Sequence, residues 1–175
     1  PNTPNEKGVP GLMVALQVPA PKTALLLANH PSTKVEFSNS LGETPLMLAA
    51  ITNQLDLANV LIARGADVNR EGWTPLHYAA TKGHREMMRL LLENDAYIDS
   101  ESANGTTPLM MAAFSTSPLA VKLLLEEGAD PTLVNHGNAS ALDIALSKDH
   151  QQSAFYIRAF IESWYIQNPI KEWLD

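Results

Sequence analysis

The feature that most constrains this chain is a nine-residue segment that recurs with a period of about 33 residues. The segment begins at Gly42, Gly72 and Gly105 and reads Gly-x-Thr-Pro-Leu-x-x-Ala-Ala in each copy. Thr107 follows Thr74 by 33 residues, whereas Thr74 follows Thr44 by only 30, so one connecting turn is three residues shorter. A fixed period of this length indicates stacked helical units, because no unit can bury its apolar face alone.

Each copy predicts two short helices joined by tight turns. The threonine caps free amides, and the proline suits the first helical position, which needs no N–H. The Leu and Ala-Ala positions give the first helix a small-residue face. Asn53 and Gly83 stand where a left-handed residue would end that helix. A leucine-rich second helix follows, and we expect it to end at turns containing Gly65, Asp95 and Gly128.

Two weaker copies begin at Gly8 and Asn138. With them, residues 1–175 form one domain, whose five units lie at about residues 5–38, 39–68, 69–101, 102–134 and 135–162. A capping helix and tail follow at residues 163–175. We interpret the aromatic, helix-periodic stretch 155–165 as a helix that closes the last core, and a partner-binding helix is the alternative. Asn168-Pro169 is expected to end this helix.

The pattern Gly-x-Thr-Pro-Leu-His-x-Ala-Ala-x-x-Gly-His is nearly complete from Gly72 to His84, and it resembles the ankyrin repeat. The resemblance covers about nine-tenths of the chain. It implies an all-α solenoid of stacked helix-turn-helix units with projecting hairpin loops. It also implies that hairpin tips and inner helices form a concave protein-binding face. In detail the chain is similar to small stand-alone bacterial ankyrin proteins, which favours the periplasm, with the cytoplasm as the alternative.

Composition narrows the function further. The chain is 45% hydrophobic, enough for a core, and its net charge is 12 − 19 = −7. An acidic chain with no basic run is a poor ligand for nucleic acid or anionic membranes and suits a basic partner. No apolar stretch approaches the roughly 20 residues of a membrane span. The chain has no cysteine, and we find neither a catalytic motif nor zinc-ligand spacing. We therefore expect no enzyme activity, catalytic residue, metal site or cofactor.

Conspicuous polar residues have structural interpretations. His77 occupies the histidine of the repeat pattern, where we expect it to bond turn backbone rather than act in catalysis or bind a metal. His84 belongs to the turn between two helices. Asp67, Asp99 and Asp130 recur in the later turns, where their carboxylates should accept hydrogen bonds from nearby amides.

The remaining variable positions, at the hairpin tips and inner helices, are predicted to bind the partner. They are Leu41, Glu43, Ile51, Thr52, Arg70, Glu71, Trp73, Thr81, Lys82, Asn104, Thr106, Phe114 and Ser115. An exposed Trp73 would anchor an interface; alternatively its ring fills the gap beside the shortened hairpin. Phe114 has the same two possible roles, interface contact or packing.

We therefore expect a monomeric, non-enzymatic module that binds another protein through its concave face. The alternatives are an inhibitory or immunity-type partner of an enzyme or toxin, a structural spacer, and an enzyme whose site lies between repeats. Residues 1–8 resemble residues 131–138, so we also expect a further helix pair before Pro1. The first unit should then expose an apolar face around Leu12, Met13, Leu25 and Leu26.

Overall fold

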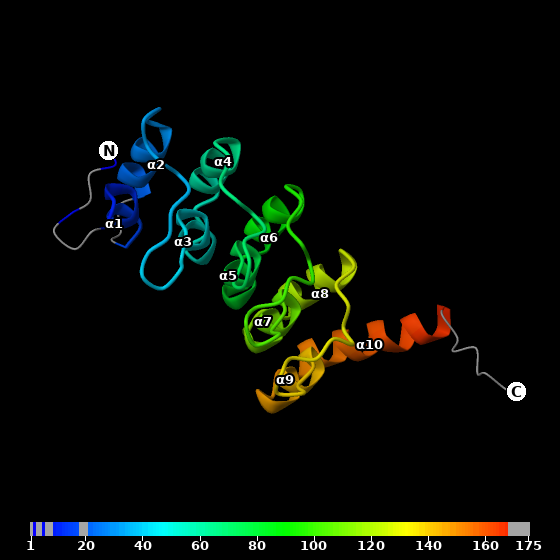
Figure 1. Cartoon of the computed structure of the whole chain (residues 1–175). Helices are drawn as coiled ribbons and strands as arrows, with labels where there is room; N and C mark the ends of the chain where they lie inside the picture. The colour runs from blue at the N-terminus through cyan, green and yellow to red at the C-terminus, as the bar shows by residue number, and fades with distance from the viewer. Residues whose placement is uncertain (1, 3–4, 6–8, 18–20, 168–175) are drawn as a thin grey trace, which may run out of the picture.

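The computed structural model describes residues 2, 5, 9–17 and 21–167, with side chains up to residue 163. This part contains ten helices and no β-strand. The inner layer is α1 (Gly11–Gln17), α3 (Pro45–Ile51), α5 (Pro75–Lys82), α7 (Pro108–Phe114) and α9 (Ala141–Ser147). The outer layer is α2 (Pro21–Asn29), α4 (Leu55–Ala63), α6 (Arg85–Leu92), α8 (Pro118–Glu126) and α10 (Gln151–Gln167). Figure 1 shows the helix pairs stacked in chain order, which confirms the predicted all-α solenoid.

The inner helices begin as the Thr-Pro pattern predicts. Thr44 Oγ1 accepts a hydrogen bond from the amide of Met47 at 3.3 Å, and Thr107 Oγ1 accepts one from Met110 at 3.4 Å. Both caps are followed by proline at the first helical position. In the last unit Ser140 caps α9 without a proline. The cap therefore depends on the side-chain hydroxyl, and proline only favours it.

The turns contain left-handed residues at the predicted places. Asn53 has φ of 55° and Gly83 has φ of 67° after the inner helices. Asp95 has φ of 62° where the other units have Gly65 and Gly128. A non-glycine residue in this conformation costs about 1 kcal/mol, and the carbonyl of Asp95 accepts a hydrogen bond from Asn69 Nδ2 at 2.6 Å.

The core is continuous along the stack. Both alanines of the Ala-Ala pair are fully buried in each strong copy, and Ala145 is fully buried in the last copy; the pairs are Ala49 and Ala50, Ala79 and Ala80, and Ala112 and Ala113. α3, α5, α7 and α9 contact one another more extensively than α4, α6 and α8 do. Closer approach on the inner side favours a face that is concave there.

A ladder of hydrogen bonds connects the turns that follow the outer helices. In each rung a side-chain oxygen accepts from a backbone amide about 30 residues further along the chain. The pairs are Asn2 with Lys34 (2.7 Å), Glu36 with Asp67 (3.1 Å), Asn69 with Tyr97 (2.7 Å) and Asp99 with Asp130 (3.1 Å). These bonds fix the position of each turn relative to its neighbour.

The aspartates divide between two roles within this ladder. Asp67 and Asp130 accept from amides two residues on, at 2.9 and 2.8 Å, as predicted for local turns. Asp99 instead reaches the next unit, because it stands two positions later in the repeat. Burial raises the pKa of the Asp99 carboxyl, and the hydrogen bond from the Asp130 amide opposes that rise.

The first unit differs from expectation. Leu12 and Met13 are fully buried, because α1 packs against both α2 and α3, so the predicted exposure of these two side chains is wrong. Leu25 is half-buried against the core. Leu26 remains 74% exposed on α2, as predicted.

The last unit ends in a longer helix than the others. α10 runs without interruption from Gln151 to Gln167 and packs on α8 and α9, so no separate capping helix begins at residue 163. Ala154 and Ile157 of α10 are buried in the core. Residues 155–165 therefore belong to one closing helix, as predicted. The predicted helix end at Asn168-Pro169 and the tail lie outside the described residues.

Arg64, at the end of α4, ties the second unit to the first. Its guanidinium donates to carbonyls at the end of α2 and in the turn that follows, namely those of Ala28, His30 (3.0 Å), Pro31 (3.0 Å) and Thr33 (2.8 Å). Free carbonyls at a helix end need donors, and one planar side chain supplies them here.

We predict that Arg64→Met, which keeps the apolar stem and removes the donors, lowers the free energy of unfolding by about 2 kcal/mol. Hydrogen exchange should accelerate first in residues 21–35, because these residues lose the donated bonds. The matched control is Arg89→Met on the exposed side of α6, which should change little. Equal urea midpoints for the two variants would contradict the role assigned to Arg64.

Candidate functional site

The hairpin tips, which we call fingers, project beside the inner helices. They are the α3 finger (39–43), the α5 finger (69–73), the α7 finger (102–106) and the α9 finger (135–139). Asn39 Oδ1 accepts from the amides of Leu41 and Glu43, both at 2.9 Å. Asn135 Oδ1 closes the α9 finger in the same way, with amides at 2.9 and 3.1 Å. These fingers are therefore held by their own side chains.

The α5 finger is the short one, and its opening residue has a different task. Asn69 stands five residues before the capping Thr74, as Asn39 does before Thr44. The three-residue deletion also places Asn69 at the ladder position. Its Oδ1 accepts from the Tyr97 amide and its Nδ2 donates to the Asp95 carbonyl, so both side-chain polar atoms bind the turn that follows α6.

The exposed side chains of the fingers and inner helices form what we call the inner face. Eleven of the predicted partner-binding residues keep an accessible side chain. The exposed ones are Leu41, Thr52, Glu71, Trp73, Lys82, Asn104 and Phe114, and the half-buried ones are Glu43, Ile51, Arg70 and Thr81. The guanidinium of Arg70 lies 3.7 Å from the Glu36 carboxylate, so Arg70 already has an anionic neighbour within the chain.

Two predicted contact residues are corrected by the structure. Thr106 is buried because the α9 finger packs against the α7 finger, with the His136 amide donating to the Asn104 carbonyl at 2.9 Å. Ser115 is buried at the end of α7, where its hydroxyl donates to the Ala112 carbonyl at 2.8 Å. Neither side chain is available to a partner.

The two aromatic residues are partly packed and partly free. The Trp73 ring meets the buried His77 edge-on, with centroids 5.1 Å apart, yet Trp73 stays 39% exposed. Phe114 is 49% exposed, and Lys148 Nζ lies 4.3 Å from its ring centroid. Both rings are thus held in place while leaving apolar surface accessible.

One row of the inner face was not predicted from the sequence. The position between His77 and Ala79 of the pattern is half-buried in every described inner helix from α3 onward, and it holds Leu48, Tyr78, Met111 and Ile144. The 33-residue period could have revealed this row, because the position varies while the alanine that follows it is the same in all four copies.

Tyr78 connects this row to the α3 finger. Its hydroxyl donates to Glu43 Oε1 at 3.2 Å, and Asn39 Nδ2 donates to Glu43 Oε2 at 2.8 Å. Burial and the nearby Glu43 charge raise the pKa of Tyr78 to about 12. The phenol is therefore a donor at neutral pH.

His77 is the buried centre beneath Trp73. Its Nδ1 accepts from the Thr74 amide at 3.1 Å, and its Nε2 lies 2.8 Å from the Thr106 carbonyl in the next unit. Both contacts suit a neutral ring protonated on Nε2. Burial lowers the pKa of His77 to about 4, although the hydrogen bond to the Thr106 carbonyl opposes this. His84 Nε2, 3.1 Å from the Ile51 carbonyl, similarly ties a turn to the preceding unit.

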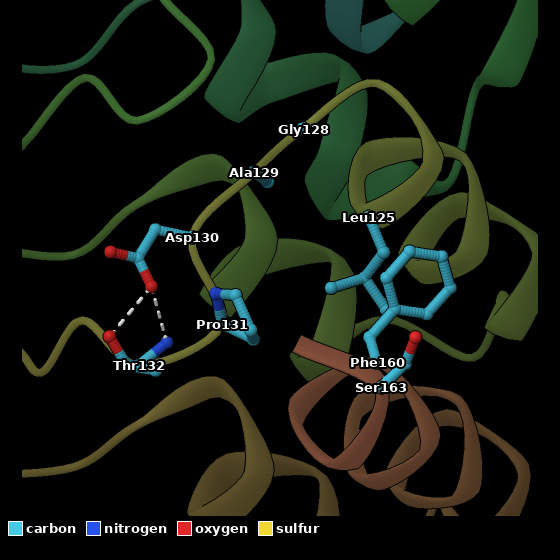
Figure 2. A pocket seen from close by; sticks show the side chains of 8 residues that line it. All are labelled: Leu125, Gly128, Ala129, Asp130, Pro131, Thr132, Phe160 and Ser163. Carbon is cyan, nitrogen blue, oxygen red and sulfur yellow. Dashed lines mark hydrogen bonds between the residues drawn. The ribbon is translucent and has the colours of Figure 1, made fainter. Parts of the chain in front are cut away.

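A separate groove lies at the C-terminal end of the stack. It encloses about 540 Å³, and the residues lining it include Leu125, Pro131 and Phe160. Figure 2 shows the turn of the fourth unit on one side and α10 on the other. The groove exists because α10 continues straight where the other outer helices end in a turn. None of the predicted site residues lines it.

Within the described part of the chain, no three His, Asp or Glu side chains gather as a metal site would require. Nor does any described helix have the length and apolar character to cross a membrane.

Comparison with known proteins places these features in context. A family model described as "Ankyrin repeats (3 copies)" matches residues 12–102, and one described as "Ankyrin repeat" matches residues 104–136. Ankyrin repeat and KH domain-containing protein mask-1 of Caenorhabditis elegans is 36% identical over 76% of the chain. Ankyrin repeat and SAM domain-containing protein 6 of Rattus norvegicus is 33% identical over 67%, and the nuclear factor NF-kappa-B p105 subunit of Mus musculus is 34% identical over 71%.

The chain spans only 5%, 14% and 13% of the length of these three proteins. All three come from animals, so the predicted likeness to bacterial proteins is not confirmed.

We predict a pH-dependent loss of stability that originates at His77. Its pKa is about 4 in the folded chain and about 6.5 when unfolded, so only the unfolded chain gains this proton as the pH falls through that window. The stabilisation is complete above pH 6.5, and about 3 kcal/mol is lost by pH 4. His77→Met, which installs the residue found at this position in α3 and α7, should remove that step from urea denaturation measured across pH.

His30→Met, at an exposed position, controls for the loss of one histidine. If His77→Met retains the full pH dependence of the wild type, the buried neutral histidine is not its source.

Proposed function

Because the chain belongs to the ankyrin repeat family, we propose that it is a non-enzymatic module that binds one partner protein through its inner face. Ankyrin repeats are protein–protein interaction modules, and the finer statement here concerns which surface is used. The observation that carries it is the state of Trp73 and Phe114. Each aromatic ring is anchored by a neighbouring side chain and still presents apolar surface.

The mechanism is presentation by a preformed surface. The ladder and the finger hydrogen bonds already fix the backbone, so little conformational entropy is lost when a partner docks. Large aromatic side chains in such a setting are typical anchors of an interface. The inner helices also present four half-buried side chains, which are those of Leu48, Tyr78, Met111 and Ile144.

The alternatives differ in what the binding achieves. An inhibitory or immunity-type partner of an enzyme or toxin would use the same face, and a structural spacer would use none. An enzyme would need convergent ionisable groups, and the perturbed His77 is buried and fully engaged in hydrogen bonds. We propose a monomer with a basic protein partner and no nucleic-acid ligand. The periplasm, or alternatively the cytoplasm, remains the proposed location.

The anchors can be tested by affinity capture from an extract of the native source. The wild type should retain one stoichiometric partner, and Trp73→Ala and Phe114→Ala should each weaken its affinity by more than about 1 kcal/mol. Leu119→Ala is the matched control, because Leu119 is an exposed apolar residue on the outer helix α8. If only Leu119→Ala loses binding, the partner binds the outer helices and the proposed inner face is wrong. Absence of any partner would favour the spacer.

The charge of the chain gives a second test on the same complex. With a net charge of −7, association with a basic partner should slow as salt rises, because charges separated by more than about 10 Å are screened at 0.1 M salt. Stopped-flow measurement between low and high ionic strength reports this rate. A rate that does not change would show that the acidic charge has no part in recognition.

A further inference from the structure

We propose, on the basis of the proposed function, that Glu43 is the receptor for an arginine side chain of the partner. Glu43 follows the exposed tip of the α3 finger, where Leu41 is 80% exposed. The position makes its carboxylate part of the inner face. Three properties of this group point to a guanidinium as its ligand.

The first property is that the carboxylate is held in place by neutral donors. The Tyr78 hydroxyl lies 3.2 Å from Oε1 and Asn39 Nδ2 lies 2.8 Å from Oε2. The two donors come from different units, since Tyr78 lies on α5 and Asn39 opens the α3 finger. Together they fix the position and orientation of the carboxylate without neutralising its charge. Two oriented oxygens suit the planar fork of a guanidinium.

The second property is that this negative charge has no cationic partner among the described residues. The ion pairs in that part of the chain are Arg70 with Glu36 and Lys122 with Glu126. A half-buried carboxylate without a cation has lost part of its hydration and gained no charge pair. A cation supplied by a partner would provide that pair.

The third property is the register with the aromatic anchor. Glu43 and Trp73 occupy the same repeat position on adjacent fingers, 30 residues apart in sequence. Packed helices are separated by about 8–10 Å, and an extended segment advances about 3.3 Å per residue. An extended partner segment that places arginine at Glu43 would therefore place a residue about three positions away at Trp73. The geometry points to a ligand with arginine and an apolar residue at that spacing.

The probe is a phage-displayed library of random 12-residue peptides, selected on the wild-type chain. Enriched peptides should share an arginine, with an apolar residue about three positions away. The strongest peptide is then synthesised twice, once with arginine and once with citrulline, which has nearly the same shape without the charge. Calorimetry measures the Kd of both peptides for each variant.

Glu43→Gln removes the charge from a side chain of the same size, and Glu86→Gln makes the same change at an exposed position on α6. We expect Glu43→Gln to weaken the arginine peptide about tenfold or more, and Glu86→Gln to leave its Kd unchanged. Citrulline should weaken binding to the wild type to a similar extent and have little further effect in Glu43→Gln. Tyr78→Phe is the second variant, for use if Glu43→Gln proves unstable. It keeps the charge of Glu43 and removes one hydrogen-bond donor, so we expect it to weaken the arginine peptide less than Glu43→Gln does.

The outcomes separate this inference from the proposed function. Peptides without a shared arginine, peptides that share a lysine instead, or equal Kd values for wild type and Glu43→Gln would overturn the role of Glu43. In those cases a loss of affinity in Trp73→Ala would still support binding at the inner face. If neither Trp73→Ala nor Phe114→Ala affects any selected peptide, or if no peptide is enriched, both proposals fail.

Discussion

The close packing of the inner helices, whose alanines are buried, is the interaction on which the rest of the structure depends. The alanines of these helices are fully buried from Ala49 and Ala50 in α3 to Ala145 in α9, and small side chains allow helix axes to approach. That approach sets the distance between successive fingers. It also brings Tyr78 on α5 within hydrogen-bonding distance of Glu43, on the finger of the preceding unit. The packing of the core therefore sets the distance between successive fingers of the inner face.

The helix caps of the repeat tolerate different side chains at one position. The third residue after the cap is Met47, His77, Met110 and Asp143 in successive inner helices. In each, a sulfur, nitrogen or oxygen atom accepts from the amide of the capping residue, at 3.4, 3.1, 3.5 and 2.8 Å. Only the histidine has a second polar atom that reaches the following unit. The lowered pKa of His77 therefore belongs to a side chain that joins two units of the stack.

Much of the fold could be predicted because it is local. The Thr-Pro caps, the left-handed Asn53 and Gly83, and the helix pairs all follow from residues within a few positions of one another. The candidate site was harder to predict from the sequence, because the residues that contact one another there lie about 30 positions apart. Thr106 is buried by a finger that follows it by about 30 residues, Arg64 serves carbonyls of the preceding unit, and Glu43 is held by Tyr78. A repeat period locates equivalent positions, but it does not tell which neighbour covers them.

The main departure of this chain from a uniform stack lies at the α5 finger, where the repeat is three residues shorter. Deletion of three residues merges the ladder position with the finger-opening position at Asn69, and the ladder takes both polar atoms of its side chain. The α5 finger therefore lacks the side-chain closure that Asn39 gives the α3 finger. Trp73 stands at the base of this shortened finger, and its contact with the buried His77 supplies the order that the turn itself does not. An aromatic ring fixed by the core rather than by its loop can stay exposed without being mobile, which is the state that an interface anchor requires.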